Sequence, residues 1–166
     1  MAGFVITDAS PLIGLARVDG LPWLHVLFGT VWMPPEVKCE VISDGSTNQA
    51  FVGEAALLEA ERQGWLKVTG SAPTSPELPD LDEGETACIR VALAQAIPAL
   101  LLMDERAGRM VAQELGLKVA GTAAVIGMAK SRGLIPSARD VFARLHTSDF
   151  RISAQVITTI LRRVGE

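Results

Sequence analysis

Short apolar runs alternate with segments of helical periodicity along this sequence, and that alternation constrains the fold more than any other feature. The runs of strand length cover residues 4–6, 30–33, 66–69, 99–103 and 118–120. They are apolar nearly throughout, which is typical of strands buried on both faces, and parallel strands need a helical crossover between them. The pattern therefore predicts an α/β fold, a three-layer α/β/α sandwich with a five-stranded, mostly parallel sheet.

Helical spacing of apolar residues fills the segments between these strands and continues to the C-terminus. It predicts helices over residues 12–18, 23–28, 35–42, 51–63, 85–96 and 105–115. Three further helices, over residues 123–132, 138–145 and 154–164, follow the last strand without another strand between them, and Ser153 is expected to cap the last one. The sequence thus predicts a helical C-terminal part.

The length and composition indicate one domain that folds on its own. The chain has 166 residues, of which 49% are hydrophobic and 20% charged, so we expect a single domain over residues 1–166. The longest apolar stretch, residues 94–103, contains Pro98 and is far shorter than the roughly 20 residues that cross a bilayer. No basic signal-peptide start is present. These features predict a soluble, cytoplasmic protein that binds no membrane.

The cysteines argue against a zinc site, and the net charge argues against sequence-independent attraction to nucleic acid. Cys39 and Cys88 have no His or Cys partner at metal-ligand spacing, so a zinc site is not expected and both thiols are predicted to be buried and reduced. The net charge of −4 gives no general attraction for phosphate backbones. If nucleic acid is the substrate, another group must neutralise its charge.

Two acids follow predicted strands directly, and ligands of open α/β sheets bind at the carboxyl ends of strands. Asp8 follows "FVIT" and Asp104 follows "ALLLM". Pro11 suits the first position of the next helix, which would make Ser10 its cap and leave Asp8 without that role. Asp104 is open to two interpretations, as the cap of the helix after it or as a site residue.

Two glutamates are further candidates. Glu85 lies in the first turn of a predicted helix, where an acid is ordinarily structural, yet this helix begins at the same end of the sheet as the strand before Asp104. Glu40 lies in "PPEVKCEVISDG", where the pattern alone does not distinguish it from Glu36. Four carboxylates without His or Cys suit a hard cation such as Mg²⁺ or Mn²⁺. The chain has no GxSxG, Walker or GxGxxG motif.

These residues resemble the PIN domain family, specifically small prokaryotic PIN-like proteins. The resemblance lies in "VITDASPLIGLARV", "VWMPPEVKCEVI", "LDEGETACIRVALA" and "LLMDERAGRMVAQELGLKVAGTAAVIGMAKSRGLI". It implies a PIN-like sheet in which the first and fourth strands are neighbours. It also implies a catalytic set of Asp8, Glu40, Glu85 and Asp104, and this is what selects Glu40 over Glu36. Many relatives carry aspartate where Glu85 stands, and Glu105 alone offers a fifth acid, so the number of metal ions stays open.

The function implied is that of a metal-dependent endoribonuclease, the toxin of a toxin-antitoxin pair. Asp8, Glu85 and Asp104 would bind Mg²⁺ or Mn²⁺, while Glu40 would ligate through water or act as a base. RNA is the expected substrate, with a small antitoxin protein as a possible partner and a homodimer as the favoured assembly.

Three residues are candidates for substrate binding. They are Ser10, which alternatively caps a helix, and Arg106 and Arg109, which alternatively are solvated on a helix face.

Three alternatives remain open. A response-regulator domain would carry an acidic pair after the first strand, where this chain has Thr7 and Asp8, and a haloacid-dehalogenase phosphatase would carry Asp-x-Asp where this chain has "DAS". Both fit poorly. The third is a non-catalytic module that keeps the fold and docks RNA or a protein.

Overall fold

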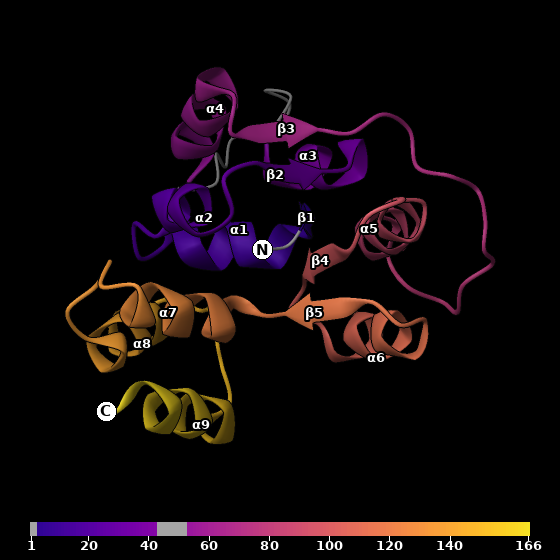
Figure 1. Ribbon diagram of the computed structural model, residues 1–166. Helices are drawn as coiled ribbons and strands as arrows, with labels where there is room; N and C mark the ends of the chain where they lie inside the picture. Colours follow the sequence, from indigo (N-terminus) through magenta and orange to yellow (C-terminus); the bar gives the residue numbers. More distant parts are fainter. Residues whose placement is uncertain (1–2, 43–52) are drawn as a thin grey trace.

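A parallel five-stranded sheet forms the centre of the protein in the computed structural model, which describes residues 3–42 and 53–166 (Figure 1). Its strands are β1 (Phe4–Thr7), β2 (Val31–Met33), β3 (Leu66–Val68), β4 (Ala99–Leu102) and β5 (Lys118–Ala120). The strand order is β3-β2-β1-β4-β5, and all neighbours run parallel. Each of the five predicted runs matches one of these strands to within one residue at either end.

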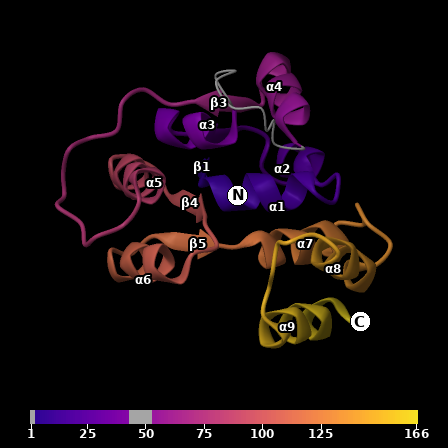
Figure 2. The same ribbon diagram turned by 180° about the vertical axis from the view of Figure 1, so that it is seen from behind.

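Helices cover both faces of the sheet (Figures 1 and 2). Figures 1 and 2 place α1, α2, α4 and α7 on one face and α5 and α6 on the other, with α8 and α9 beyond α7. Helix α3 contacts both α1 and α5. The helices are α1 (Ala9–Ala16), α2 (Leu21–Phe28), α3 (Pro35–Val41), α4 (Glu54–Gln63), α5 (Glu83–Leu93), α6 (Arg106–Glu114), α7 (Thr122–Ser131), α8 (Ala138–His146) and α9 (Ala154–Val164). The predicted α/β/α sandwich and helical C-terminal part are confirmed, although residues 51 and 52 of the predicted fourth helix lie outside the described residues.

The strand order reverses at β1, which brings the ends of β1 and β4 together. Thr7 pairs with Leu102, and the backbone N–H of Asp8 donates to the carbonyl of Leu102 at 2.9 Å. The neighbouring first and fourth strands are therefore confirmed. In sheets of this kind the carboxyl ends of the strands at such a reversal are where ligands bind.

Burial on both faces of the central strands stabilises this arrangement. Ile6 in β1 and Leu101 and Leu102 in β4 are fully buried, and each such side chain contributes about 1.5–3 kcal/mol relative to exposure. No helix within residues 3–42 and 53–166 is long and apolar enough to cross a lipid bilayer.

The start of α1 differs from the prediction. The helix begins at Ala9, so Ser10 lies inside it and the predicted Ser10 cap is wrong. Pro11 falls in the first turn, where backbone N–H groups have no helical partner, so its missing N–H does not prevent the helix from starting earlier. Asp8 takes the N-cap position with extended backbone angles, yet its side chain makes no capping hydrogen bond.

The two cysteines differ from each other in burial. Cys88 is buried, as predicted, and its Sγ lies 3.4 Å from the carbonyl oxygen of Thr7. Cys39 is exposed, which corrects the prediction for that residue. The core-facing side of α3 is formed by Val37 and Val41 at helical spacing, and Cys39 falls between them on another side of the helix. By contrast, the predicted cap of α9 is confirmed, because Ser153 Oγ accepts from the N–H of Val156.

Candidate functional site

The carboxylates of Asp8 and Glu40 converge on Gly84 at the carboxyl end of the sheet. A Cβ atom placed on Gly84 would lie 2.8 Å from Glu40 Oε1 and 3.2 Å from Asp8 Oδ1. Asp8 follows β1, Glu40 lies on α3 and Gly84 is the second residue of α5. The missing side chain of this glycine therefore makes room for two carboxylates from distant parts of the sequence.

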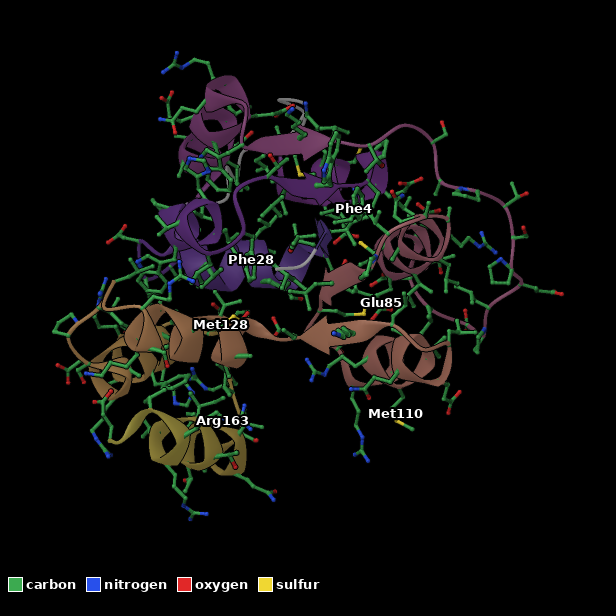
Figure 3. All side chains as sticks on the ribbon, viewed as in Figure 1. Phe4, Phe28, Glu85, Met110, Met128 and Arg163 are labelled. Carbon is green, nitrogen blue, oxygen red and sulfur yellow. The ribbon has the colours of Figure 1, made fainter. Side chains whose placement is uncertain are left out.

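Glu85 is fixed next to this pair by a capping box at the start of α5. The N–H of Glu85 donates to Asp82 Oδ1 at 2.7 Å, and the N–H of Asp82 donates to Glu85 Oε2 at 3.1 Å. The other oxygen, Oε1, points toward α6, where a Cβ on Gly108 would lie 2.8 Å from it. Glu85 is labelled in Figure 3 and is only 5% exposed. Glu85 therefore has the helix-capping role that the sequence suggested, and its Oε1 atom takes no part in the capping box.

Burial and like charges raise the pKa values of these acids. The pKa of Asp8 is raised to about 7, mainly by burial and further by the charges of Asp82, Glu40 and Glu85, although the N–H of Ala9 lowers it. Burial is also the largest cause for Glu40 and for Glu85, and the charge of Asp82 adds to both. No basic side chain is among the causes of these three shifts. We refer to Asp8, Glu40, Asp82 and Glu85 as the acidic group.

Asp104 lies on the same edge of the sheet but has protein partners. Its Oδ1 accepts from the backbone N–H of Thr122 and its Oδ2 from Thr122 Oγ1, both at 2.7 Å. Burial raises the pKa of Asp104, whereas the two Thr122 hydrogen bonds and the charge of Arg109 lower it. Asp104 does not cap α6, since Glu105 holds the N-cap position there. The side chain therefore ties the end of β4 to the start of α7.

The chemistry of these residues fits a hard divalent cation, although their present arrangement does not enclose one. Closely placed carboxylates with raised pKa values and no basic neighbour are the donor set that Mg²⁺ or Mn²⁺ prefers. Within the part of the chain that the structure describes, no three Asp, Glu, His or Cys side chains are arranged to hold an ion together. Two predicted ligands have hydrogen-bond partners within the protein: Glu85 Oε2 accepts from the N–H of Asp82, and both oxygens of Asp104 accept from Thr122.

The remaining candidates lie in different surroundings. Glu36, one turn before Glu40, lines a separate cavity together with Glu83 and Arg90. Ser10 is half-buried, and its hydroxyl makes no hydrogen bond to any residue that the structure describes. Arg106 and Arg109 line a cavity of about 700 Å³ that also includes Asp104.

Sequence reasoning missed two contributors to this edge. Asp82 adds its charge to each of the other members of the acidic group, and the Asp82-x-x-Glu85 spacing of a capping box was a visible signal for its position. Thr122 binds Asp104 from 18 residues further along the chain. This contact exists because β4 and β5 are neighbours, and no local pattern around Thr122 indicates it.

Comparison with known proteins gives one match. A family model described as a PIN domain matches residues 4–166. Neither the curated proteins nor the solved structures include a match to the chain. The family match covers all five strands and every member of the acidic group, together with Asp104.

Proposed function

Because the chain belongs to the PIN domain family, we propose that it is a metal-dependent endoribonuclease that hydrolyses phosphodiester bonds in RNA. PIN domains are generally nucleases and usually use divalent metals. The observation that carries the proposal is the convergence of Asp8 and Glu40 on Gly84, without a basic neighbour among the causes of their pKa shifts. Negatively charged carboxylates this close together repel one another unless they are protonated or bind a cation. They therefore suit a metal site better than a structural one.

The proposed roles follow the position of each side chain. Asp8, Glu85 through Oε1, and Asp104 would hold Mg²⁺ or Mn²⁺, and Glu40 would orient the attacking water or accept its proton. A raised pKa suits Glu40 for that second role, because a general base works best when its pKa is near the working pH. The cation supplies a more acidic water and neutralises the charge of the phosphate. Because each carboxylate oxygen has two lone pairs, Asp104 can bind the cation while it keeps its hydrogen bonds to Thr122.

The narrower parts of the proposal rest on the donor atoms, the family resemblance and the surface. The all-oxygen donor set favours Mg²⁺ or Mn²⁺ over softer metals. The toxin role, with a small antitoxin as partner, rests on the resemblance to small prokaryotic PIN-like toxins. A homodimer is supported by exposed apolar side chains such as Val26 and Val156, which are 53% and 43% exposed.

One observation favours a second function, a non-catalytic module that docks RNA or a protein. Both oxygens of Asp104 already have partners in Thr122, as a purely structural carboxylate would. In that case the chain would bind its partner without cleaving it.

The test is to incubate the protein with a mixed single-stranded RNA pool, with Mn²⁺ or with EDTA. We expect the wild-type protein to cleave the RNA with Mn²⁺ but not with EDTA. The Asp8→Asn and Glu40→Gln variants should lose cleavage in Mn²⁺. Glu36→Gln is the matched control, since it removes one charge from the same helix outside the acidic group, and it should retain cleavage. Cleavage by Asp8→Asn at the wild-type rate would overturn the proposal, and RNA binding without metal-dependent cleavage would establish the second function instead.

A further inference from the structure

A cavity of about 700 Å³ beside Asp104 is lined by four arginines. Arg106 and Arg109 come from α6, Arg151 from the segment before α9, and Arg163 from α9. Among the described residues, Asp104 is the one acidic side chain in the lining. We refer to the four arginines and the space between them as the arginine cleft. In Figure 3, Arg163 lies on the side of α9 that faces α7.

The arginine cleft holds more positive charge than its one acidic residue, Asp104, balances. Across residues 3–42 and 53–166, the side-chain ion pairs involve Arg17, Lys38, Arg62 and Arg144, and none of the cleft arginines. Arg106 and Arg163 make no side-chain hydrogen bond to any described residue. A chain with a net charge of −4 therefore concentrates an excess of guanidinium groups in one cavity, and such a field attracts anions.

Two of the arginines are held in position by backbone carbonyl groups. Arg109 Nη1 donates to the carbonyl of Met103 at 2.8 Å. Arg151 Nη1 donates to the carbonyls of His146 at 3.0 Å and Phe150 at 3.3 Å, and also to that of Ser148. All these bonds use Nη1, which leaves Nη2 of both arginines for a ligand. Because the guanidinium groups are already oriented, binding costs less side-chain entropy.

The arginine cleft adjoins the acidic group along the edge of the sheet. Asp104, in its lining, follows β4, and Asp8 follows the neighbouring β1, with Thr7 and Leu102 in register. A strand of nucleic acid with one phosphate at the acidic group can therefore place its next phosphates in the cleft. Guanidinium groups match phosphate oxygens geometrically, so the arginine cleft suits a phosphate backbone.

We infer that the arginine cleft binds the phosphate backbone of single-stranded RNA on one side of the cleaved bond, an inference that rests on the proposed nuclease function. Arg151 and Arg163, from the C-terminal part of the chain, are the residues it adds to the substrate site. Single-stranded RNA carries one negative charge per nucleotide, so its successive phosphates can each contact a different arginine of the cavity. The competing occupant, an acidic peptide, is an outcome of the test below.

The test compares Arg163→Gln with Arg162→Gln, two neighbouring substitutions on α9 that remove the same charge. Arg162 is exposed and is not in the lining of the cleft, so it is a matched control. The probe is a fluorescent RNA of about 12 nucleotides, within the size that single-strand sites cover, and binding is measured by anisotropy in EDTA so that no cleavage occurs. We expect Arg163→Gln to weaken binding about fivefold and Arg162→Gln to change it little.

Salt dependence gives a second readout. Each phosphate contact with a single strand contributes about 0.7 to the slope of log K against log salt, so Arg163→Gln should lower the magnitude of this slope by about 0.7. Equal effects of the two substitutions would overturn the inference, because overall charge rather than the cleft would then determine binding. If Arg163→Gln does not fold, Arg106→Gln on the exposed start of α6 gives the same comparison.

Two more measurements separate this inference from the proposed function. A polyglutamate peptide whose binding depends on Arg163, while RNA binding does not, would overturn the inference in favour of an acidic peptide. With Mn²⁺ present, Arg163→Gln should raise KM for RNA and leave kcat unchanged. Cleft-dependent RNA binding without any cleavage would support the cleft and overturn only the nuclease function, whereas cleavage with RNA binding unaffected by Arg163→Gln would overturn only the cleft.

Discussion

The acidic group and the arginine cleft are neighbours on one edge of the sheet, yet they carry excess charge of opposite sign. In the acidic group, carboxylates face one another, and burial and repulsion raise the pKa values of Asp8, Glu40 and Glu85. In the arginine cleft, four arginines and one carboxylate, Asp104, line the same cavity, and Asp104 also accepts two hydrogen bonds from Thr122. The acidic group therefore lacks a cation, and the arginine cleft lacks anions to balance its remaining positive charge. A phosphodiester with a divalent ion supplies both, so the contrast itself describes the expected ligand.

The largest expected effect comes from removing a charge at the centre of the acidic group. Asp8→Asn removes a proposed metal ligand and should reduce RNA cleavage by about 1000-fold, which corresponds to the several kcal/mol of transition-state stabilisation that a bound cation contributes. The metal-free protein should keep its fold, since the Asp8 side chain makes no capping hydrogen bond and its loss relieves repulsion. Cleavage assays and thermal melts in EDTA test both parts. An unfolded Asp8→Asn protein would make Asp8 a structural residue.

A pH dependence of stability should mark the acidic group in the metal-free protein. The pKa of Asp8 is about 7 in the folded state against 3.8 ordinarily, so the folded state binds more protons between these values. The contribution of Asp8 to the free energy of unfolding should therefore be largest below about pH 4 and be lost as the pH rises to about 7, by at most about 4 kcal/mol at 1.36 kcal/mol per unit.

Urea unfolding in EDTA at pH 5 and pH 8 measures this decrease. Asp8→Asn should make the decrease much smaller, and an identical decrease in both proteins would show that Asp8 does not cause it. Substitution of Arg106, in the arginine cleft, should leave the decrease in place.

A smaller effect should follow when Asp104 loses its hydroxyl partner. Thr122→Val keeps the shape of the side chain but leaves Asp104 Oδ2 without its hydrogen bond, which should lower the free energy of unfolding by about 1–3 kcal/mol. Thr122→Ser retains the hydroxyl and is the control. Denaturant titrations of wild type and both variants at pH 7 measure this loss, and a Thr122→Val protein as stable as wild type would mean that the hydroxyl hydrogen bond contributes nothing.

The smallest effect is expected for Gly84→Ala. The added Cβ would lie 2.8 Å from Glu40 Oε1 and 3.2 Å from Asp8 Oδ1, so these carboxylates must move apart. Mn²⁺ affinity should fall about tenfold, while stability changes by less than about 1 kcal/mol because alanine favours the helix by that amount. Gly127→Ala, which meets Ile160 on α9 instead, should not affect Mn²⁺ binding. Calorimetry with Mn²⁺ measures both variants, and similar affinities would contradict the close approach at Gly84.

Local sequence patterns predicted the elements well and their contacts less well. Apolar runs bounded by polar residues located all five strands, because burial on both faces leaves a signal in the sequence itself. The start of α1 was misplaced because a proline is tolerated at several positions of a first turn. Cys39 was wrongly expected in the core, since helical position within α3 and not residue type decides its exposure.

The site was predictable where its residues follow strands. Asp8 and Asp104 could be placed at one edge because strands end there, but the hydrogen bonds of Asp104 to Thr122 depend on the pairing of β4 with β5. Of the four arginines in the arginine cleft, the sequence indicated two, Arg106 and Arg109, as candidates for substrate binding. Arg163 reaches the same cavity because α9 packs against α7, a long-range contact that no spacing in the sequence indicates.

The capping box of α5 links the acidic group to local motion of the backbone. Glu85 Oε2 holds the N–H of Asp82, while Glu85 Oε1 faces away from the cap. A ligand that pulls the Glu85 carboxylate out of the capping box breaks its hydrogen bond with the N–H of Asp82 and loosens the first turn of α5. The amide hydrogen of Asp82 then exchanges with solvent more readily. Conversely, fraying of that turn frees the carboxylate. The beginning of α5 therefore behaves as a small reporter of the state of the site, readable on the time scale of hydrogen exchange.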